Sequence, residues 1–279
     1  GDIDILVSRD KLTTTCKILS EHGFRQTHAV EKHTCLQKLD ICVEVHAMVS
    51  VFPENEKGIF TRRFMAEALQ HTASASIGDS SVLTGMYQII ALLAHMDQHL
   101  SDSGIGLRQL CDWAVTVDTQ RDQIGDKQLV FLDRCGLLSF AKIVTKICEK
   151  YLGLPSFSWS EDVDEALVDA LMEDIIKGGN FQAHGQQRPF AGVLTDAYNV
   201  DEISKTSTMH SYFQYIRTRI SYDYPWAKSR LWLAVFGLFF PARWIVRMLL
   251  GKRRKFSITQ AVQSARQREQ LLRKLKLFK

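Results

Sequence analysis

The sequence has no long apolar run and no cysteine spacing typical of a metal site. Its longest apolar stretch, residues 231–240, is ten residues long and ends at Pro241, whereas a membrane-spanning helix needs about 20. The six cysteines are scattered without a CxxC pair, and in a chain of this length they do not indicate a disulfide scaffold. We therefore expect no transmembrane segment and a reducing, cytoplasmic compartment.

Other common signatures are also absent. The sequence contains neither the GxxxxGK[ST] phosphate loop nor the GxSxG nucleophile elbow, so phosphate-loop NTPases, α/β-hydrolases and zinc ribbons have no support. The chain opens at Gly1 without an initiator Met or the basic and apolar regions of a signal peptide. We interpret it as a fragment or processed chain that begins inside a domain.

What is present is the composition of a globular protein. The 279 residues are 46% hydrophobic and 24% charged, which excludes disorder as the main state and allows one large domain or two of common size. Charge is divided unevenly: residues 1–204 hold 18 Lys and Arg against 29 Asp and Glu, a net −11, and residues 205–279 hold 17 against 2, a net +15. A basic part of this kind binds an anionic partner or packs on the acidic remainder of its own chain. We favour the intramolecular or solvated alternative.

The first fifty residues show mixed β and α patterns. Alternation of Ile and Asp predicts a strand over 2–8, with Ile3 and Ile5 entering the core, and Gly23 ends a helix predicted over 10–22. A hairpin over 24–30 and 33–39 and a strand over 41–48 follow. Thereafter the helical period dominates. Helices are predicted at 81–100, 106–118, 127–151, 161–177 (with Ser160 as N-cap) and 257–277, and a glycine-rich loop at Gly178–Pro189.

Three acidic residues form the main candidate site. Asp2 and Asp4 stand two apart on the first strand, so both carboxylates project from one face. Glu44 has the same polar-face position on the later strand and supplies a third carboxylate if the two strands are neighbours. Like charges this close repel, and a divalent cation such as Mg²⁺ is the usual way to hold them together. The alternative is a solvated strand edge, which is the more frequent role of Asp-x-Asp on spacing alone.

Histidines provide weaker candidates. His46 follows Glu44 on the polar face and is equally suited to orienting Glu44, to contacting phosphate or to a structural role. His95 and His99 lie one helical turn apart, near Asp97, and can share a metal, but no third ligand is evident and we favour a structural role. The Gly178–Pro189 loop, with Asn180 and His184, is either a cleft wall or a connector.

The order of these elements resembles the nucleotidyltransferase superfamily that includes the DNA polymerase beta palm. The motif residues are Gly1-Asp2-Ile3-Asp4 on the first strand, the helix ending at Gly23-Phe24, the hairpin, and Val43-Glu44-Val45-His46. More narrowly, the chain resembles the bacterial family of uncharacterised nucleotidyltransferases. That likeness continues through Leu92–His95, His99, Leu107–Asp112, Gly179–Phe181, Tyr224–Trp226 and Pro241–Trp244.

The resemblance implies an α+β fold: a nucleotidyltransferase palm over 1–55, a helical domain over 56–200, and a basic helical region over 201–279 packed on it. It also implies transfer of a nucleoside monophosphate from an NTP to an acceptor, with two Mg²⁺ ions. Asp2, Asp4 and Glu44 are the implied metal ligands and catalytic residues, and Glu44 is a metal ligand or general base. The superfamily also has a strand and a Gly-Ser or Gly-Gly turn upstream of the paired acids, so the resemblance implies that the palm is truncated, and we expect an exposed sheet edge.

Two other functions remain open. The first is a non-catalytic binding or membrane-surface protein on a degenerate palm, because Arg243, Arg247 and the basic run 252–255 accompany an apolar helix face that suits an anionic membrane surface. The second is a polymerase or RNA-modifying relative, in which that basic run binds nucleic acid. We expect no nucleic acid partner and regard peripheral membrane contact as the alternative to a purely cytoplasmic protein.

Overall fold

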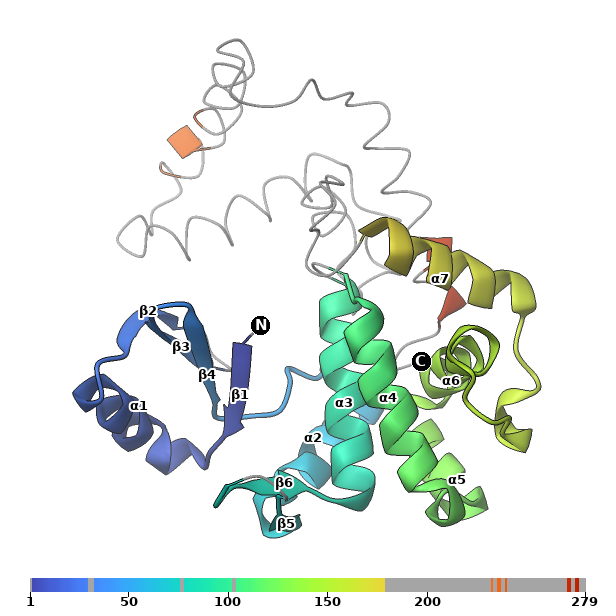
Figure 1. The fold of residues 1–279 in the computed structure, drawn as a ribbon, viewed down its shortest axis with the longest axis horizontal. Helices are drawn as coiled ribbons and strands as arrows, with labels where there is room; N and C mark the ends of the chain where they lie inside the picture. Colours follow the sequence, from blue (N-terminus) through green and yellow to red (C-terminus); the bar gives the residue numbers. More distant parts are fainter. Residues whose placement is uncertain are drawn as a thin grey trace. The chain divides into compact units, whose positions relative to one another are not determined.

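The computed structural model describes residues 2–29, 33–75, 78–101 and 104–178, together with eight isolated positions between 232 and 275 (Figure 1). The chain divides into two compact units, one comprising Gly1–His99, Leu107–Asp169 and Leu275–Lys279 and the other Leu100–Gly106 and Ala170–Lys274. The fold is α+β, as expected from the sequence. Three predicted segments lie outside the described residues: the loop after Gly178, the basic segment 243–255 and almost all of the final helix. The three predicted domains stay a prediction.

The first unit opens with a four-stranded sheet in the order β1-β4-β3-β2. Its strands are β1 (Asp2–Leu6), β2 (Arg25–Ala29), β3 (His33–Lys38) and β4 (Ile41–His46). The predicted hairpin is confirmed, because β2 pairs antiparallel with β3, and β3 pairs antiparallel with β4. The first strand pairs parallel with β4 and lies at the edge of the sheet. The chain therefore brings its first and fourth strands together as neighbours.

Helix α1 (Leu12–Glu21) covers one face of the sheet (Figure 1). That face has a core of Leu36, Val43 and Val45, against which apolar residues of β1 and α1 pack. Gly23 closes the helix with φ +89°, a left-handed conformation that glycine adopts without steric cost. Ile5 joins this core, but Ile3 is 53% exposed, so the prediction that both enter it was wrong for Ile3. An edge strand leaves its outermost apolar side chain without a neighbour on one side.

Helices dominate the rest of the described chain. Besides β5 (Thr72–Ser74) and β6 (Ser81–Leu83), the elements are α2 (Glu56–Met65), α3 (Gly85–Ser101), α4 (Leu107–Thr119), α5 (Asp126–Arg134), α6 (Leu138–Leu152), α7 (Glu165–Gly178) and the short 3-10 helices η1 (Arg9–Lys11), η2 (Ala68–Gln70), η3 (Arg121–Gln123) and η4 (Ser158–Ser160). Within the first unit, α4 and α6 pack together, and buried Trp113 donates its indole N–H to Thr145 Oγ1 at 2.9 Å. In the described ranges no helix combines the length and apolar character needed to cross a membrane.

Three predicted helix boundaries were wrong. The helix predicted from residue 81 begins at Gly85, because residues 81–83 pair with β5 instead. The segment predicted as one helix over 127–151 is two helices, α5 and α6, separated at Gly136, whose φ is +72°. Ser160 does not cap α7, since Asp164 Oδ1 accepts the N–H of Ala166 there.

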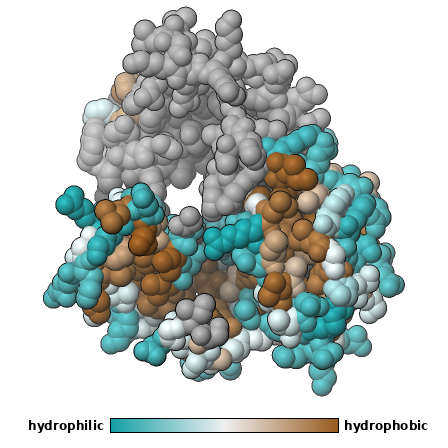
Figure 2. All heavy atoms as spheres, in the orientation of Figure 1, coloured by the Kyte–Doolittle hydropathy of each residue, from teal (hydrophilic) through white to brown (hydrophobic). Residues whose placement is uncertain are grey.

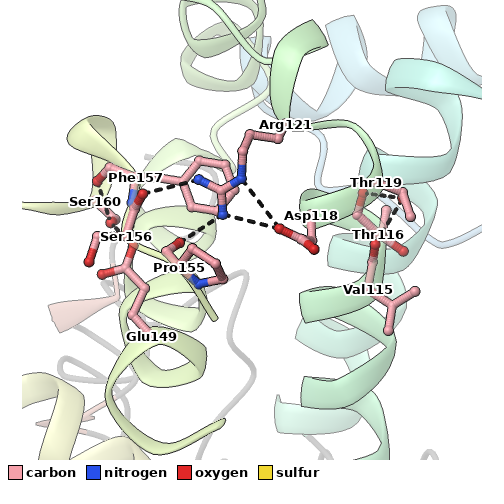
Figure 3. A network of polar contacts seen from close by, with 10 residues as sticks. All are labelled: Val115, Thr116, Asp118, Thr119, Arg121, Glu149, Pro155, Ser156, Phe157 and Ser160. Atoms are coloured by element: carbon pink, nitrogen blue, oxygen red, sulfur yellow. Dashed lines mark hydrogen bonds and ion pairs between the residues drawn. The ribbon is translucent and has the colours of Figure 1, made fainter. Parts of the chain in front are cut away.

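A polar network joins the end of α4 to the segment after α6 (Figure 3). The Arg121 guanidinium donates to the carbonyl oxygens of Pro155 and Ser156 at 2.8 and 3.1 Å and lies 3.7 Å above the Phe157 ring. Glu149, whose side chain is 5% exposed, accepts hydrogen bonds from the Phe157 N–H and the Ser160 hydroxyl. These contacts stabilise the irregular segment after α6. Side chains bind the carbonyl oxygens of Pro155 and Ser156 and the N–H of Phe157, which have no partners in a helix or strand.

The described surface is largely hydrophilic, with several apolar areas (Figure 2). Large apolar side chains that are about half exposed include Ile3, Ile18 and Ile41, which come from β1, α1 and β4. Single exposed apolar residues are normal on globular proteins. These residues accordingly carry no functional argument.

Candidate active site

The register of β1 against β4 places the predicted acids on one face of the sheet. Asp2 is opposite Cys42, and Asp4 is opposite Glu44. The neighbouring positions Val43 and Val45 point into the apolar core beneath the sheet, so the alternating side chains of β1 and β4 present the acids on the other face. Asp4 and Glu44 are therefore adjacent across the strand pair, and Asp2 lies on the same face two residues earlier.

His46 lies between two of these acids. Its Nε2 is 2.9 Å from Asp4 Oδ1 and 3.3 Å from Glu44 Oε2. The His46 side chain is 6% exposed and that of Glu44 is 18% exposed, whereas 43% of the Asp4 side chain is exposed. One imidazole thus contacts both carboxylates and fixes their separation, so of its three predicted roles the geometry supports orienting the acids.

A second histidine, His33, was missed by the sequence interpretation. It lies opposite His46 in the antiparallel pair of β3 and β4, and its Nδ1 is 3.5 Å from Glu44 Oε2. The signal was present in the hairpin: its polar positions place His33 on the same face as Glu44 once β3 and β4 are paired. The buried imidazoles of His33 and His46 flank the Glu44 carboxylate.

These contacts keep the two carboxylates ionised. The hydrogen bond with His46 is the largest influence on Glu44 and lowers the pKa of its carboxyl group, against the opposing effects of burial and of the Asp4 charge. Burial is the largest influence on Asp4 and by itself raises its pKa. The hydrogen bond from His46 and the electrostatic effects of His95, His46 and His99 together outweigh burial, so the pKa of Asp4 is also lowered.

The pair His95 and His99 lies on one face of α3, as predicted. Their ring centroids are 4.4 Å apart at an interplanar angle of 67°. Because both residues help to lower the pKa of Asp4, their charges act on the candidate site. A structural role was expected for them from the sequence, and their effect on Asp4 in β1 was not predicted.

Two thiols lie on the same face of the sheet. Cys35 Sγ and Cys42 Sγ are 2.9 Å apart, and all six cysteines are free. The contact with Cys35, together with burial, raises the pKa of the Cys42 thiol to about 12, so this thiol is protonated at neutral pH. Neither a thiolate nucleophile nor a disulfide is needed to describe the site.

The chemistry of the donor set fits Mg²⁺. Asp4 and Glu44 offer ionised oxygen donors at adjacent register positions, and Asp2 adds a third from the same face; oxygen donors are the ligands that Mg²⁺ prefers. Among the described residues, two clusters of at least three possible ligands have donor atoms within 4.8 Å of one another, namely His33–Glu44–His46 and His28–Cys35–Glu44. Asp2 and Asp4 are in neither, so the three predicted acids share a face without forming one such cluster.

A small mixed sheet with paired acids on its first strand and a third acid on the neighbouring parallel strand is the arrangement expected of a nucleotidyltransferase palm. The chain belongs to the family of uncharacterised nucleotidyltransferases, whose family model matches residues 1–153, from β1 through the end of α6. The likeness that the sequence suggested beyond residue 153 stays a prediction. No curated protein and no solved structure matches the chain.

Proposed function

We propose that the protein is a Mg²⁺-dependent nucleotidyltransferase that moves a nucleoside monophosphate from an NTP to an acceptor hydroxyl. The acceptor oxygen forms a bond to the α-phosphorus, and the bond from that phosphorus to the bridging oxygen breaks. Pyrophosphate leaves with the electron pair of the broken bond, and the acceptor proton passes to solvent or to a carboxylate. The observation that carries this proposal is the adjacency of Asp4 and Glu44 on parallel strands of a chain that belongs to this family.

In this proposal the acids act mainly as ligands and as fixed negative charges. Asp2 and Asp4 would hold the metal ions, which would supply positive charge to neutralise the leaving group. Glu44 completes the ligand set. Its lowered pKa makes its carboxylate a weak base near neutral pH, which favours the role of ligand over that of general base.

His46 is a positioning residue in the same proposal. Its Nε2 contacts both Asp4 and Glu44. A hydrogen bond to a carboxylate favours its ionised form, so this contact keeps the two acids in the charged state that a cation would bind. His95 and His99 act electrostatically on Asp4 and help to lower its pKa, so in this proposal they favour the ionised form of a metal ligand.

The test is the substitution Asp4→Asn in the full-length protein. Transfer of label from an α-³²P-labelled NTP should fall at least about 100-fold, because loss of a metal ligand removes charge stabilisation of the transition state. Asp10→Asn is the matched control, since Asp10 is exposed in η1 and its neighbour in an ion pair is Lys11. Circular dichroism should show the same fold for both variants.

A second measurement does not require the acceptor. Calorimetric titration with a non-hydrolysable NTP analogue should show that Mg²⁺ raises nucleotide affinity in the wild-type protein but not in Asp4→Asn. Nucleotide affinity that is indifferent to Mg²⁺, or full transfer activity in Asp4→Asn, would contradict the proposal. That result would favour a non-catalytic binding protein built on the same fold.

A further inference from the structure

A second set of possible metal ligands lies beside the acids. His33, Glu44 and His46 have donor atoms that all lie within 4.8 Å of one another. Both imidazoles are more than nine-tenths buried, with side chains 8% and 6% exposed, and the Glu44 side chain is 18% exposed. The residues come from paired strands, with His33 opposite His46 in the register of β3 and β4. Burial and pairing hold the three groups in place before any ligand arrives.

Two of the three donor separations match the edges of a tetrahedral coordination shell. Nitrogen and oxygen donors lie about 2.0 to 2.2 Å from Zn²⁺, so neighbouring donors of a tetrahedral site are about 3.4 Å apart. In this protein Glu44 Oε2 is 3.5 Å from His33 Nδ1 and 3.3 Å from His46 Nε2. Both separations are close to that donor spacing, so a metal ion placed between the three groups would replace the contacts that Glu44 makes with the two imidazoles.

The donor types also select the ion. Mg²⁺ prefers oxygen ligands and retains several waters, whereas imidazole nitrogen suits Zn²⁺, Co²⁺ and related transition metals. We propose that His33, Glu44 and His46 bind one divalent transition-metal ion, of the class that prefers nitrogen donors. Three protein ligands leave a fourth position open, which is the pattern of reactive rather than purely structural zinc sites. The nearest acid is Asp4, whose Oδ1 is 2.9 Å from His46 Nε2.

This site shares Glu44 with the proposed Mg²⁺ site but not Asp2. Glu44 can serve either ion, so an ion bound by the histidines competes with Mg²⁺ for one carboxylate. The neighbouring cluster His28–Cys35–Glu44 is the alternative ligand set. It contains the Cys35 thiol, whereas the proposed set has no sulfur donor. Sulfur ligation of Co²⁺ produces a strong near-ultraviolet charge-transfer band, which two imidazoles and a carboxylate lack.

The experiment is a Co²⁺ titration of the chelator-treated, full-length protein, followed by visible absorption. The wild-type protein should bind one equivalent with the spectrum of four-coordinate Co²⁺ and no sulfur charge-transfer band. His33→Gln should weaken binding at least about tenfold, as loss of groups at a metal centre does. The control His22→Gln should bind as wild type, because His22 lies at the exposed end of α1 and contacts the Ile18 carbonyl.

Further variants separate the possible outcomes. Cys35→Ser should keep the site, and His46→Gln should lose it if His33→Gln proves poorly folded. Asp2→Asn should keep Co²⁺ binding while it weakens Mg²⁺-dependent nucleotide binding, so failure of this site and failure of the proposed function are distinguishable. Absence of stoichiometric Co²⁺ binding, or loss of binding in Cys35→Ser but not in His33→Gln, would overturn the proposal.

Discussion

The polar face of the sheet and the network around Arg121 and Glu149 use similar groups in different ways. In the helical network each charged group is matched by complementary partners: Arg121 by carbonyl oxygens and Asp118, and Glu149 by an N–H and a hydroxyl (Figure 3). Lys146 also forms an ion pair with Glu149. On the sheet, two carboxylates of the same sign share one imidazole nitrogen. The first arrangement stabilises a chain segment, whereas the second holds like charges together.

This difference separates a structural network from a candidate binding site. Matched hydrogen-bond partners lower the desolvation cost of a buried charge, so such a group needs no additional ligand. Asp4 and Glu44 instead share His46 as a common partner, and the Asp4 charge acts against that contact by raising the pKa of Glu44. The sheet therefore has the arrangement expected where a cation binds, and substitutions in the two regions should affect different properties.

The largest effect on stability is expected for Glu149→Ala. The change removes a nearly buried carboxylate that accepts from the Phe157 N–H and the Ser160 hydroxyl and lies 3.3 Å from Lys146. Leaving such partners unsatisfied costs about 3 kcal/mol of unfolding free energy. Urea denaturation should show this loss while NTP transfer by the folded protein stays unchanged. Glu161→Ala is the control, because Glu161 is exposed; equal losses in both variants would contradict the assignment.

Much of the sheet could be predicted from the sequence. The alternation of Asp with Ile in β1 and of Cys42, Glu44 and His46 with Val43 and Val45 in β4 indicated strands with one apolar and one polar face, and the structure has them. Apolar and polar residues alternate with a period of two, which indicates a β-strand and not a helix. The side of each strand that carries the acids followed directly from that period.

The pairing of β1 with β4 and the histidine contacts did not follow from the alternation alone. The polar positions of β3 put His33 on the Glu44 face only once β3 and β4 are paired, and that register depends on the turn at residues 39–40 and on packing against α1. The separation of α5 from α6 was missed for a different reason. Apolar residues flank Gly136 and continue the helical pattern, but Gly136 adopts a left-handed conformation and separates the two helices, and Gly23 takes the same conformation after α1.

A smaller loss of stability is expected for Arg121→Lys. Lysine keeps the positive charge beside Asp118, but it lacks the planar group that donates to two carbonyl oxygens and lies on the Phe157 ring. We expect about 1 to 2 kcal/mol of destabilisation, with transfer activity retained. Thermal unfolding of the variant measures the loss. If Arg121→Lys were as stable as wild type, charge alone would account for the network, and the contrast with the sheet would weaken.

The smallest effect is expected at the sheet itself, where His46→Gln should raise the Glu44 pKa and remove at neutral pH the stability that the lowered pKa contributes. The wild-type Glu44 carboxyl group should titrate below its usual value of 4.5, because the contact with His46 favours the ionised form. A folded-state pKa below the unfolded value stabilises the protein above the unfolded pKa, and this contribution disappears as the pH falls through the folded pKa. In His46→Gln the Glu44 pKa should rise. Protonation of Glu44 at acidic pH should then cost the variant less stability than it costs the wild-type protein. NMR titration of the labelled Glu44 carboxyl carbon measures both forms, with Glu21 as an exposed reference. An unchanged Glu44 pKa in the variant would show that His46 does not control the ionisation of the site.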